Sequence, residues 1–403
     1  MNKVLFLLLL LSIHANAQSD KSQNHSGKDT VTVEQKDVND VVKNLFKKKE
    51  KVPSDTIKIK PGKLLFSVVP GVGYTIVTNL TAVATINTSF YAGKTSDTYL
   101  SSITTLSEFS LFNHQITIPI ESNIWTKRNK FNLLGDWRYY KYPTYTYGLG
   151  SHSSLADADL IDYSYIRVYQ EALKRLKSDY FAGIGYNFDY HYNIAQKGVG
   201  DFQQYNAYAT KTVSSGLVLH LLYDGRKNVN TPEAGFYSSV TYRSNFTFMG
   251  SDNNWQSLQL DFRKYIKPLS HHNNVLAFWS FNWFTFGGHP PYFDLPSTGW
   301  DTYSNIGRGY IQGRLRDANL MYLEAEDRFD ITRSGLLGGV VFVNAQTVSE
   351  QKADLDLGEV ILPGVGGGLR VKVNKFSKIN FCIDYGFGTE HSQGFFINLC
   401  EIF

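Results

Sequence analysis

Apolar and polar side chains alternate with a period of two from residue 62 to the end of the sequence. The alternation runs in segments of about 10 to 15 residues, separated by Gly, Asn, Asp, Ser, Lys or Pro, which favour turns. Sixteen segments are found: 64–77, 79–92, 98–110, 113–126, 130–140, 162–175, 179–193, 210–225, 234–249, 253–267, 273–286, 318–330, 336–349, 363–374, 378–388 and 394–403. The pattern predicts an all-β fold, a 16-stranded antiparallel transmembrane β-barrel over residues 62–403.

The lengths of the connections support this prediction independently. The longest connectors follow odd-numbered strands: 141–161, 194–209, 287–317 and 350–362. Connectors after even-numbered strands are short, as in Thr126–Asn129, except near Asp224–Glu233. Short periplasmic turns and long outer loops alternate in this way in membrane barrels, and a soluble β-sandwich or propeller would not be expected to show it.

The alternation also assigns a face to each residue of the last two strands. Four side chains of the fifteenth strand should face lipid: Phe381, Ile383, Tyr385 and Phe387. Their neighbours should face the lumen: Asn380, Cys382, Asp384 and Gly386. In the last strand the outward set is Phe395, Ile397, Leu399 and Phe403, and Asn398 and Cys400 point inward. Glu401 interrupts the outer stripe close to the membrane interface.

The first 17 residues have the features of a secretory signal peptide. Lys3 supplies a positive charge, residues 4–13 are apolar, and Ala15-Asn16-Ala17 has the A-x-A pattern of a cleavage site. We therefore expect the mature chain to begin at Gln18.

Residues 18–61 are rich in Lys, Asp, Ser and Asn, which predicts a solvated periplasmic linker. Within it, apolar residues recur at helical spacing over about 37–50, from Asp37 to Glu50. This amphipathic helix would dock on a membrane surface or at the barrel mouth, or it is a marginal helix within a tether.

Composition excludes several classes of protein. The 40 Lys and Arg residues nearly balance the 36 Asp and Glu residues, and no basic patch predicts binding to nucleic acid. An apolar content of 42% is too high for intrinsic disorder. No apolar run is long enough for a transmembrane helix.

The sequence lacks three common catalytic and cofactor motifs. It has no G-x-S-x-G, H-E-x-x-H or P-loop pattern, and two Cys cannot form a four-thiolate zinc site. His271-His272 is expected to lie in a solvated turn. An acidic group in the third outer loop either binds a divalent cation or is a solvated loop: Asp157, Asp159 and Asp162. We therefore predict no enzyme activity, no cofactor and no metal.

The sixth outer loop carries the most informative residues. Arg308-Gly309-Tyr310 lies in a connector of some thirty residues. On the following strand Glu324 and Glu326 share the lumenal face, so an arginine folded inward would bind one of them bidentately. Alternatively Arg308 is solvated and the glutamates pair with other basic residues: Arg328, Arg370 or Lys372.

These residues resemble motifs of the bacterial surface antigen superfamily, the BamA-type and TamA-type outer-membrane barrels that insert or export proteins. The family's Y-D-x-R and x-P-x-x-G turn is similar to Leu222-Tyr-Asp-Gly-Arg226 and Thr231-Pro-Glu-Ala-Gly235 of this sequence. The matching positions are Asp224, Arg226, Pro232 and Gly235. Arg308-Gly309-Tyr310 is similar to its R-G-(F/Y) motif on an inward-folded sixth loop. Leu323–Phe329, Ile383–Gly388 and the terminal Phe403 resemble its acidic strand, closing hairpin and C-terminal targeting signal.

Three departures from the family pattern are visible. Phe342-Val343-Asn344 replaces the usual F-x-D, so Asn344 removes one acidic partner and Glu326 should carry the charge. Cys400 replaces a Gly of the last strand. Residues 18–61 are too few for one of the family's periplasmic POTRA domains, so the resemblance is to short members without them.

The resemblance implies a barrel in the bacterial outer membrane that assists assembly or transport of outer-membrane components. Its implied surroundings are outer-membrane lipid and lipopolysaccharide, its implied clients are outer-membrane proteins, and the barrel assembly machinery would insert it. The alternative is a passive channel or structural barrel without insertase activity.

Two predictions concern the C-terminal hairpin. Cys382 and Cys400 are equidistant from His391, the expected centre of the turn, and both point inward, which predicts a disulfide. A shift of one residue in the turn would instead place two unrelated thiols on opposite faces. Because open edges are costly in hydrocarbon, we also expect segments 64–77 and 394–403 to pair and close the barrel.

Overall fold

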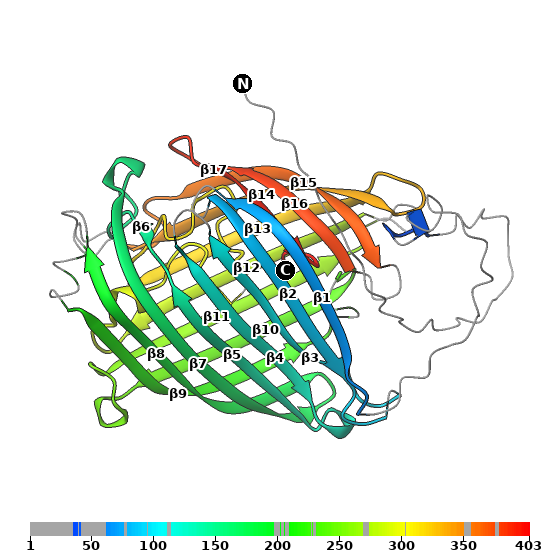
Figure 1. Cartoon of the computed structure of the whole chain (residues 1–403), viewed down its shortest axis with the longest axis horizontal. Coiled ribbons are helices and arrows are strands. Elements are labelled where there is room, and N and C mark those ends of the chain that lie inside the picture. Colours follow the sequence, from blue (N-terminus) through cyan, green and yellow to red (C-terminus); the bar gives the residue numbers. More distant parts are fainter. Residues whose placement is uncertain are drawn as a thin grey trace, which may run out of the picture.

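The computed structural model is an antiparallel β-barrel (Figure 1). It describes residues 35–38, 40–41, 62–75, 79–94, 96–110, 114–196, 202, 205, 209–226, 228, 231–268, 274–302, 304–349, 356–374 and 379–403. The predicted signal peptide and most of the predicted linker therefore lie outside the described residues, as do His271 and His272.

Seventeen strands are formed in the described chain. They are β1 (Leu65–Thr75), β2 (Asn79–Phe90), β3 (Ser101–Ser110), β4 (Ile116–Trp125), β5 (Phe131–Lys141), β6 (Thr144–Thr146), β7 (Asp159–Lys177), β8 (Tyr180–Gln196), β9 (Lys211–Asp224), β10 (Gly235–Asn245), β11 (Trp255–Ile266), β12 (Val275–Phe286), β13 (Asn319–Asp330), β14 (Leu337–Val348), β15 (Leu362–Asn374), β16 (Ile379–Phe387) and β17 (Gln393–Leu399). Four short 3-10 turns complete the described secondary structure: η1 (Lys127–Asn129), η2 (Leu155–Asp157), η3 (Thr247–Met249) and η4 (Tyr292–Asp294). No helix in this part of the chain is long and apolar enough to cross a membrane.

Sixteen of the strands follow one another around the barrel, each paired antiparallel with the next, as the sequence predicts. The seventeenth is β6, three residues of the β5–β7 connector that pair with the beginning of β7. The all-β fold class is therefore confirmed. β6 was missed because three residues are too few to show a period.

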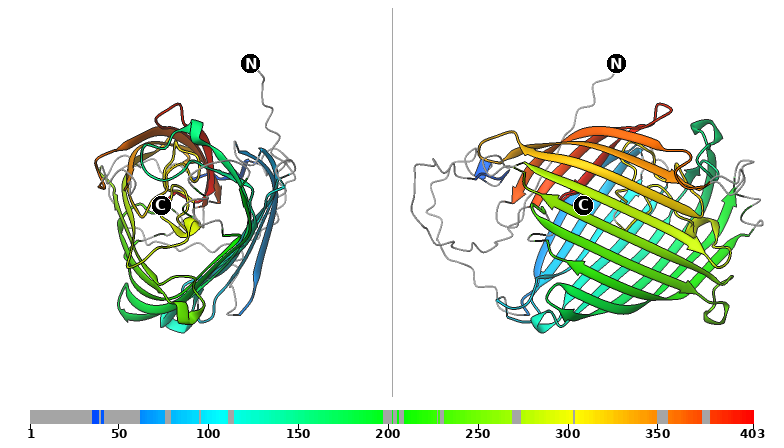
Figure 2. Two further views of the ribbon diagram at one scale, coloured as in Figure 1. Left: turned by 90° about the vertical axis from the view of Figure 1, so that its left-hand side faces the viewer. Right: turned by 180° about the vertical axis from the view of Figure 1, so that it is seen from behind.

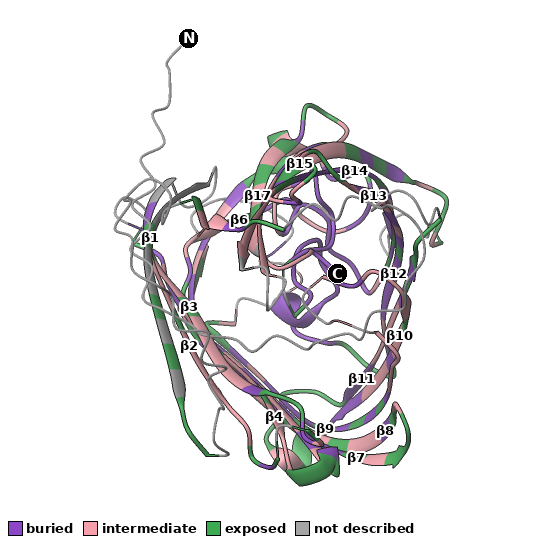
Figure 3. Cartoon of the chain, turned by 90° about the vertical axis from the view of Figure 1, so that its right-hand side faces the viewer, coloured by how far each residue is buried: buried purple, intermediate pink, exposed green. Residues whose placement is uncertain are grey.

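Burial alternates along several strands, among them β9 and β13 (Figure 3). In β13, Tyr322, Glu324 and Glu326 are buried on the lumenal face, whereas Met321 and Leu323 are exposed on the outer face. The inward faces of several strands, together with the connector between β12 and β13, form the main buried cluster. Figure 2 shows this connector, in yellow, inside the barrel.

The predicted pairing of the first and last strands is not found among the described residues. In this part of the chain the residue-by-residue ladders join β17 to β16 and β1 to β2, and none joins β1 to β17. Cys400, with φ of 75°, ends β17 after seven residues and turns the chain inward. Figure 3 accordingly places the C-terminal end of the chain inside the ring of strands.

The face predicted for Phe403 is also wrong, because Phe403 is buried in the lumen. Leu399 has a side chain that the structure does not describe, while Phe395 and Ile397 are exposed on the outer face as expected. The predicted faces therefore hold within β17 and fail beyond it, where the strand has ended.

The predicted disulfide is absent, since both cysteines are free thiols. The hairpin pairs Cys382 with Asn398, so its register is centred on Glu390 rather than on His391. Glu390 and His391 both adopt positive φ and form the turn. The Sγ atom of Cys382 donates to the carbonyl oxygen of Cys400 at 3.0 Å.

The described residues near the N-terminus contact the barrel mouth. The backbone N–H of Lys36 donates to the carbonyl of Ser334, in the turn between β13 and β14, at 3.1 Å. Asp37 and Asp40 accept hydrogen bonds from each other's backbone N–H groups, and residues 38, 40 and 41 are helical. The rest of the helix predicted over 37–50 lies outside the described residues.

Candidate functional site

The connector between β12 and β13 folds back into the lumen and brings Arg308 to the inner faces of β13 and β16. Gly309 makes this approach possible because its φ is 104° and a Cβ atom would lie 2.8 Å from the backbone of Phe387. Any larger residue would push the loop away from β16. The predicted inward fold of the sixth loop is therefore present.

Arg308 is completely buried and its guanidinium meets three carboxylates. Nη2 donates to both Glu324 and Glu326, Nε lies 3.2 Å from Glu324, and Nη1 lies 2.7 Å from Asp384. The ring of Phe342 lies 3.7 Å from the guanidinium carbon. Ion pairs in such dry surroundings stay stable only when every charge is matched and hydrogen-bonded.

The contact predicted between Arg308 and Glu326 is thus present, but Glu326 does not carry the charge alone. Glu324 and Asp384 share it. The sequence placed Asp384 on the lumenal face but did not connect it with the loop. Asn344 keeps a role as a donor, because its Nδ2 contacts the backbone carbonyl of Arg308 at 2.9 Å.

The ion pairs around Arg308 form a closed ring, referred to below as the lumenal ion ring. Arg328 joins Glu326 to Glu401, and Arg370 joins Glu401 to Asp384. The ring follows the order Arg308, Glu326, Arg328, Glu401, Arg370, Asp384 and back to Arg308. It connects the loop with β13, β15, β16 and the residues after β17.

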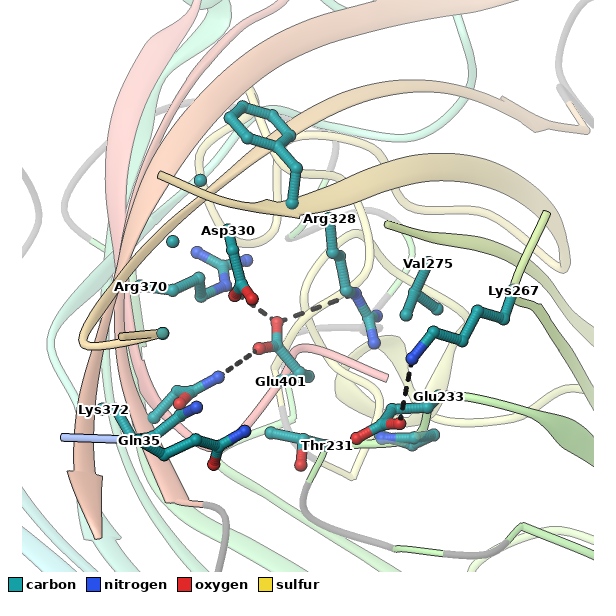
Figure 4. Close-up of a pocket in the computed structure, with 16 residues that line it drawn as sticks. Gln35, Thr231, Glu233, Lys267, Val275, Arg328, Asp330, Arg370, Lys372 and Glu401 are labelled. Atoms are coloured by element: carbon teal, nitrogen blue, oxygen red, sulfur yellow. Dashed lines mark hydrogen bonds and ion pairs between the residues drawn. The ribbon is translucent and has the colours of Figure 1, made fainter. Parts of the chain in front are cut away.

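The position of Glu401 in the sequence suggested that it lies at the membrane interface, but the structure places it elsewhere. Its side chain is only 4% exposed and points inward. Its carboxylate lies 2.8 Å from Nε of Arg370 and 2.9 Å from Nδ2 of Asn380 (Figure 4). The inward turn at Cys400 explains this change of face.

The residues after Glu401 are held from two sides. The carbonyl of Ile402 accepts from Nδ2 of Asn305, in the sixth loop, at 2.7 Å. The carbonyl of Phe403 accepts from Nη2 of Arg328 at 3.1 Å, and its ring stacks on Trp279 with centroids 5.0 Å apart. The inward position of this segment therefore depends on both the loop and the wall.

Tyr310 fixes the loop on the side away from Arg308. Its hydroxyl donates to the carbonyl of Pro363 at 2.6 Å and accepts from the backbone N–H of Thr389 at 3.1 Å. The R-G-Y motif thus contacts β15, β16 and the turn before β17.

Further loop anchors were not predicted. Arg314 contacts the backbone and hydroxyl of Ser153 in the third outer loop, and Asp294 accepts from Ser214 on β9 at 2.5 Å. Arg316 donates to the carbonyl of Tyr292 within the loop at 3.0 Å. Buried charges are rarely unpaired, so the density of Arg and Asp in residues 287–318 was the only available signal.

The turn motif lies close to part of the lumenal ion ring. Arg226 binds Asp224 bidentately, with both distances 2.8 Å, and its guanidinium lies 4.4 Å from the ring centre of Tyr237. Gly235 has a φ of 122°, which other residues rarely adopt. Pro232 lines a cavity of about 290 Å³ that Glu401, Arg328 and Arg370 also line (Figure 4).

No group of three or more His, Cys, Asp or Glu side chains that would hold a metal is found within the described ranges. Asp157 caps the short turn η2 through Ser154, and Asp159 contacts Gln196. Asp157 and Asp159 therefore have separate structural contacts.

Comparison with known proteins gives a structural match only. No protein family model matches the sequence, and no curated protein matches it. BamA from Haemophilus ducreyi lacking POTRA domains 1–3 aligns with a TM-score of 0.53 at 16% identity, covering 84% of this chain and 70% of that chain. CdiB from Acinetobacter baumannii aligns with a TM-score of 0.57 at 14% identity, covering 84% of this chain but 60% of that chain. The chain therefore has the barrel fold of BamA and CdiB, which is the fold that the sequence resemblance predicted.

Proposed function

We propose that this chain is a bacterial outer-membrane barrel that assists the insertion or translocation of other outer-membrane components. The observation that carries the proposal is the seam, where β1 and β17 each have a ladder on one side only among the described residues. Unpaired strand edges are templates for another strand, and in hydrocarbon each unpaired backbone group costs several kcal/mol. A client strand that adds to the edge would satisfy these groups.

The lumenal ion ring supports this proposal. It holds Glu401, and with it the chain beyond β17, inside the lumen and away from β1. The loop, β16 and the end of the chain are thereby fixed as one unit beside the seam. An edge kept available in this way suits a barrel that receives strands.

A passive pore is less compatible with the lumen. The sixth loop places Tyr292, Ile306 and Tyr310 in buried positions inside the barrel. Their burial means that side chains, rather than an open channel, occupy this part of the lumen. Outer-membrane lipid and lipopolysaccharide are the proposed surroundings, and the barrel assembly machinery is the proposed route of insertion.

The test is an assay of assisted folding. The full chain is reconstituted in liposomes, and the folding rate of a second, urea-denatured outer-membrane barrel is followed by its heat-sensitive mobility on gels. We expect faster folding than in empty liposomes and in liposomes that contain an unrelated porin. Equal rates in all three would contradict the proposal and favour the structural barrel.

A further inference from the structure

The membrane-facing side of the barrel carries an apolar groove across β10–β14. Its volume is about 500 Å³, within the range of ligand sites, and its surface is almost wholly apolar. Three small residues on adjacent strands form its floor: Ser280, Ala325 and Ala345. Larger residues surround them: Phe236, Phe262, Phe278, Leu323 and Val343.

The register of the sheet explains why this part of the wall is hollow. Ala325 lies between Phe278 and Val343 in one row of the sheet, and Leu323 lies opposite Ala345 in the next. Small and large side chains therefore alternate across three strands. Because Phe278, Leu323 and Val343 are 44%, 56% and 53% exposed, the depression opens to the outside of the barrel.

A cation lines the groove. Lys264 lines it, is exposed, and is paired in register with Phe236 and Phe278. Within the described ranges Lys264 makes no hydrogen bond or ion pair, whereas the nearby Lys267 lies 3.8 Å from Glu233. A charge among apolar side chains on a membrane wall calls for an anionic partner.

The position of Lys264 along the strand suits a lipid headgroup. It precedes the last residue of β11, Ile266, by two positions, which corresponds to about 7 Å of strand. A lysine so close to the end of a membrane strand reaches the headgroup layer. The groove extends from this point toward the centre of the wall.

We propose that the groove is a binding site for one phospholipid, with an acyl chain over Ala325 and Ala345 and the phosphate at Lys264. The proposal rests on the placement of this wall in a membrane and not on any insertase activity. An acyl chain fills an apolar groove that is open along its length, and the phosphate supplies the charge that Lys264 lacks. A lipid bound here would lie on the outer face of β13, directly behind the lumenal ion ring.

The test uses native mass spectrometry of the full chain in detergent with dioleoyl phosphatidylglycerol as the probe. The wild type should retain one bound lipid. Ala325→Phe should fill the groove and weaken binding about tenfold, as the loss of a buried chain predicts. Lys264→Gln should weaken binding about fivefold, because one basic residue near an anionic headgroup contributes about 1 kcal/mol.

Matched variants separate the groove from the rest of the surface. Val365→Phe adds the same ring at an outward position of β15, and Lys267→Gln removes a lysine that already has a partner, so both should bind like the wild type. Ala345→Leu is the second filling variant if Ala325→Phe does not fold, as judged by heat-sensitive gel mobility. Dioleoylglycerol, which has no phosphate, should bind equally to wild type and Lys264→Gln.

Three results would overturn the proposal. The first is unchanged lipid retention in the filling variants, and the second is an equal loss in Val365→Phe. The third is binding of glycerol 3-phosphate through Lys264 without acyl chains, which would indicate a site for free phosphate esters. Each result is independent of the folding assay, so the lipid site and the proposed function fail or stand separately.

Discussion

A single arginine satisfies three buried carboxylates, and its loss has a predictable cost. Arg308→Ala leaves Glu324, Glu326 and Asp384 without their shared partner, which should cost about 3 to 5 kcal/mol locally. We expect the barrel to fold but residues 287–318 to become accessible to added protease. Arg308→Lys should be intermediate, because an ammonium cannot reproduce the fork of a guanidinium.

Arg263 offers a matched control for this prediction. It is also a buried lumenal arginine, but it binds Asp261 on its own strand and makes no hydrogen bond or ion pair with the described residues of the loop. Arg263→Lys should leave the loop protected. Equal proteolysis of the two lysine variants would show that the loop does not depend on the lumenal ion ring.

How much of the site the sequence predicts depends on which residues share a strand. The inward positions of Glu324, Glu326 and Asp384 follow from parity, because a period of two is a local property of each strand. The contact between Arg308 and Asp384 depends on the path of a thirty-residue loop, and no local periodicity predicts such a path. The predicted faces fail beyond β17 for a different reason. The alternation was extended past Cys400, where the strand has already ended.

At the scale of the element, the register of the last hairpin predicts the oxidation state of its two cysteines. Its register sets Cys382 opposite Asn398, so the two cysteines should remain thiols. Alkylation of the unreduced, denatured protein should add two groups per chain by mass spectrometry. Recovery of an unmodified species that reacts only after reduction would contradict this register.

The segment after β17 is an element in its own right, and Phe403 anchors it. Phe403→Ala removes a buried ring that stacks on Trp279, and such truncations cost about 3 to 5 kcal/mol in well-packed cores. We expect a lower midpoint of thermal unfolding. Phe395→Ala, at a position 57% exposed on the outer face, should change the midpoint little in detergent. Similar shifts in both variants would argue against the buried position of Phe403.

For the whole molecule, the seam between β1 and β17 is the feature that local sequence patterns predict least well. The fold of sixteen consecutive strands could be predicted because turns and alternation are both local, but closure joins residues more than three hundred positions apart. The predicted closure rests on the high cost of open strand edges in hydrocarbon. In the structure the last residues instead turn inward and contact Asn305 and Arg328. No pattern in the sequence predicts these contacts.

An open seam predicts uneven protection of the backbone around the barrel. Amides in β12 and β13 are bonded within a sheet on both sides, whereas those on the free edges of β1 and β17 have no strand partner in the described chain. Hydrogen–deuterium exchange in lipid nanodiscs should therefore be faster in peptides from 65–75 and 393–399 than in those from 275–286 and 319–330. Arg308→Ala should alter exchange in 393–403 if the ion ring holds that segment inward. Uniform protection around the wall would mean that β1 and β17 pair in the membrane, and the unpaired edge would then no longer support strand insertion.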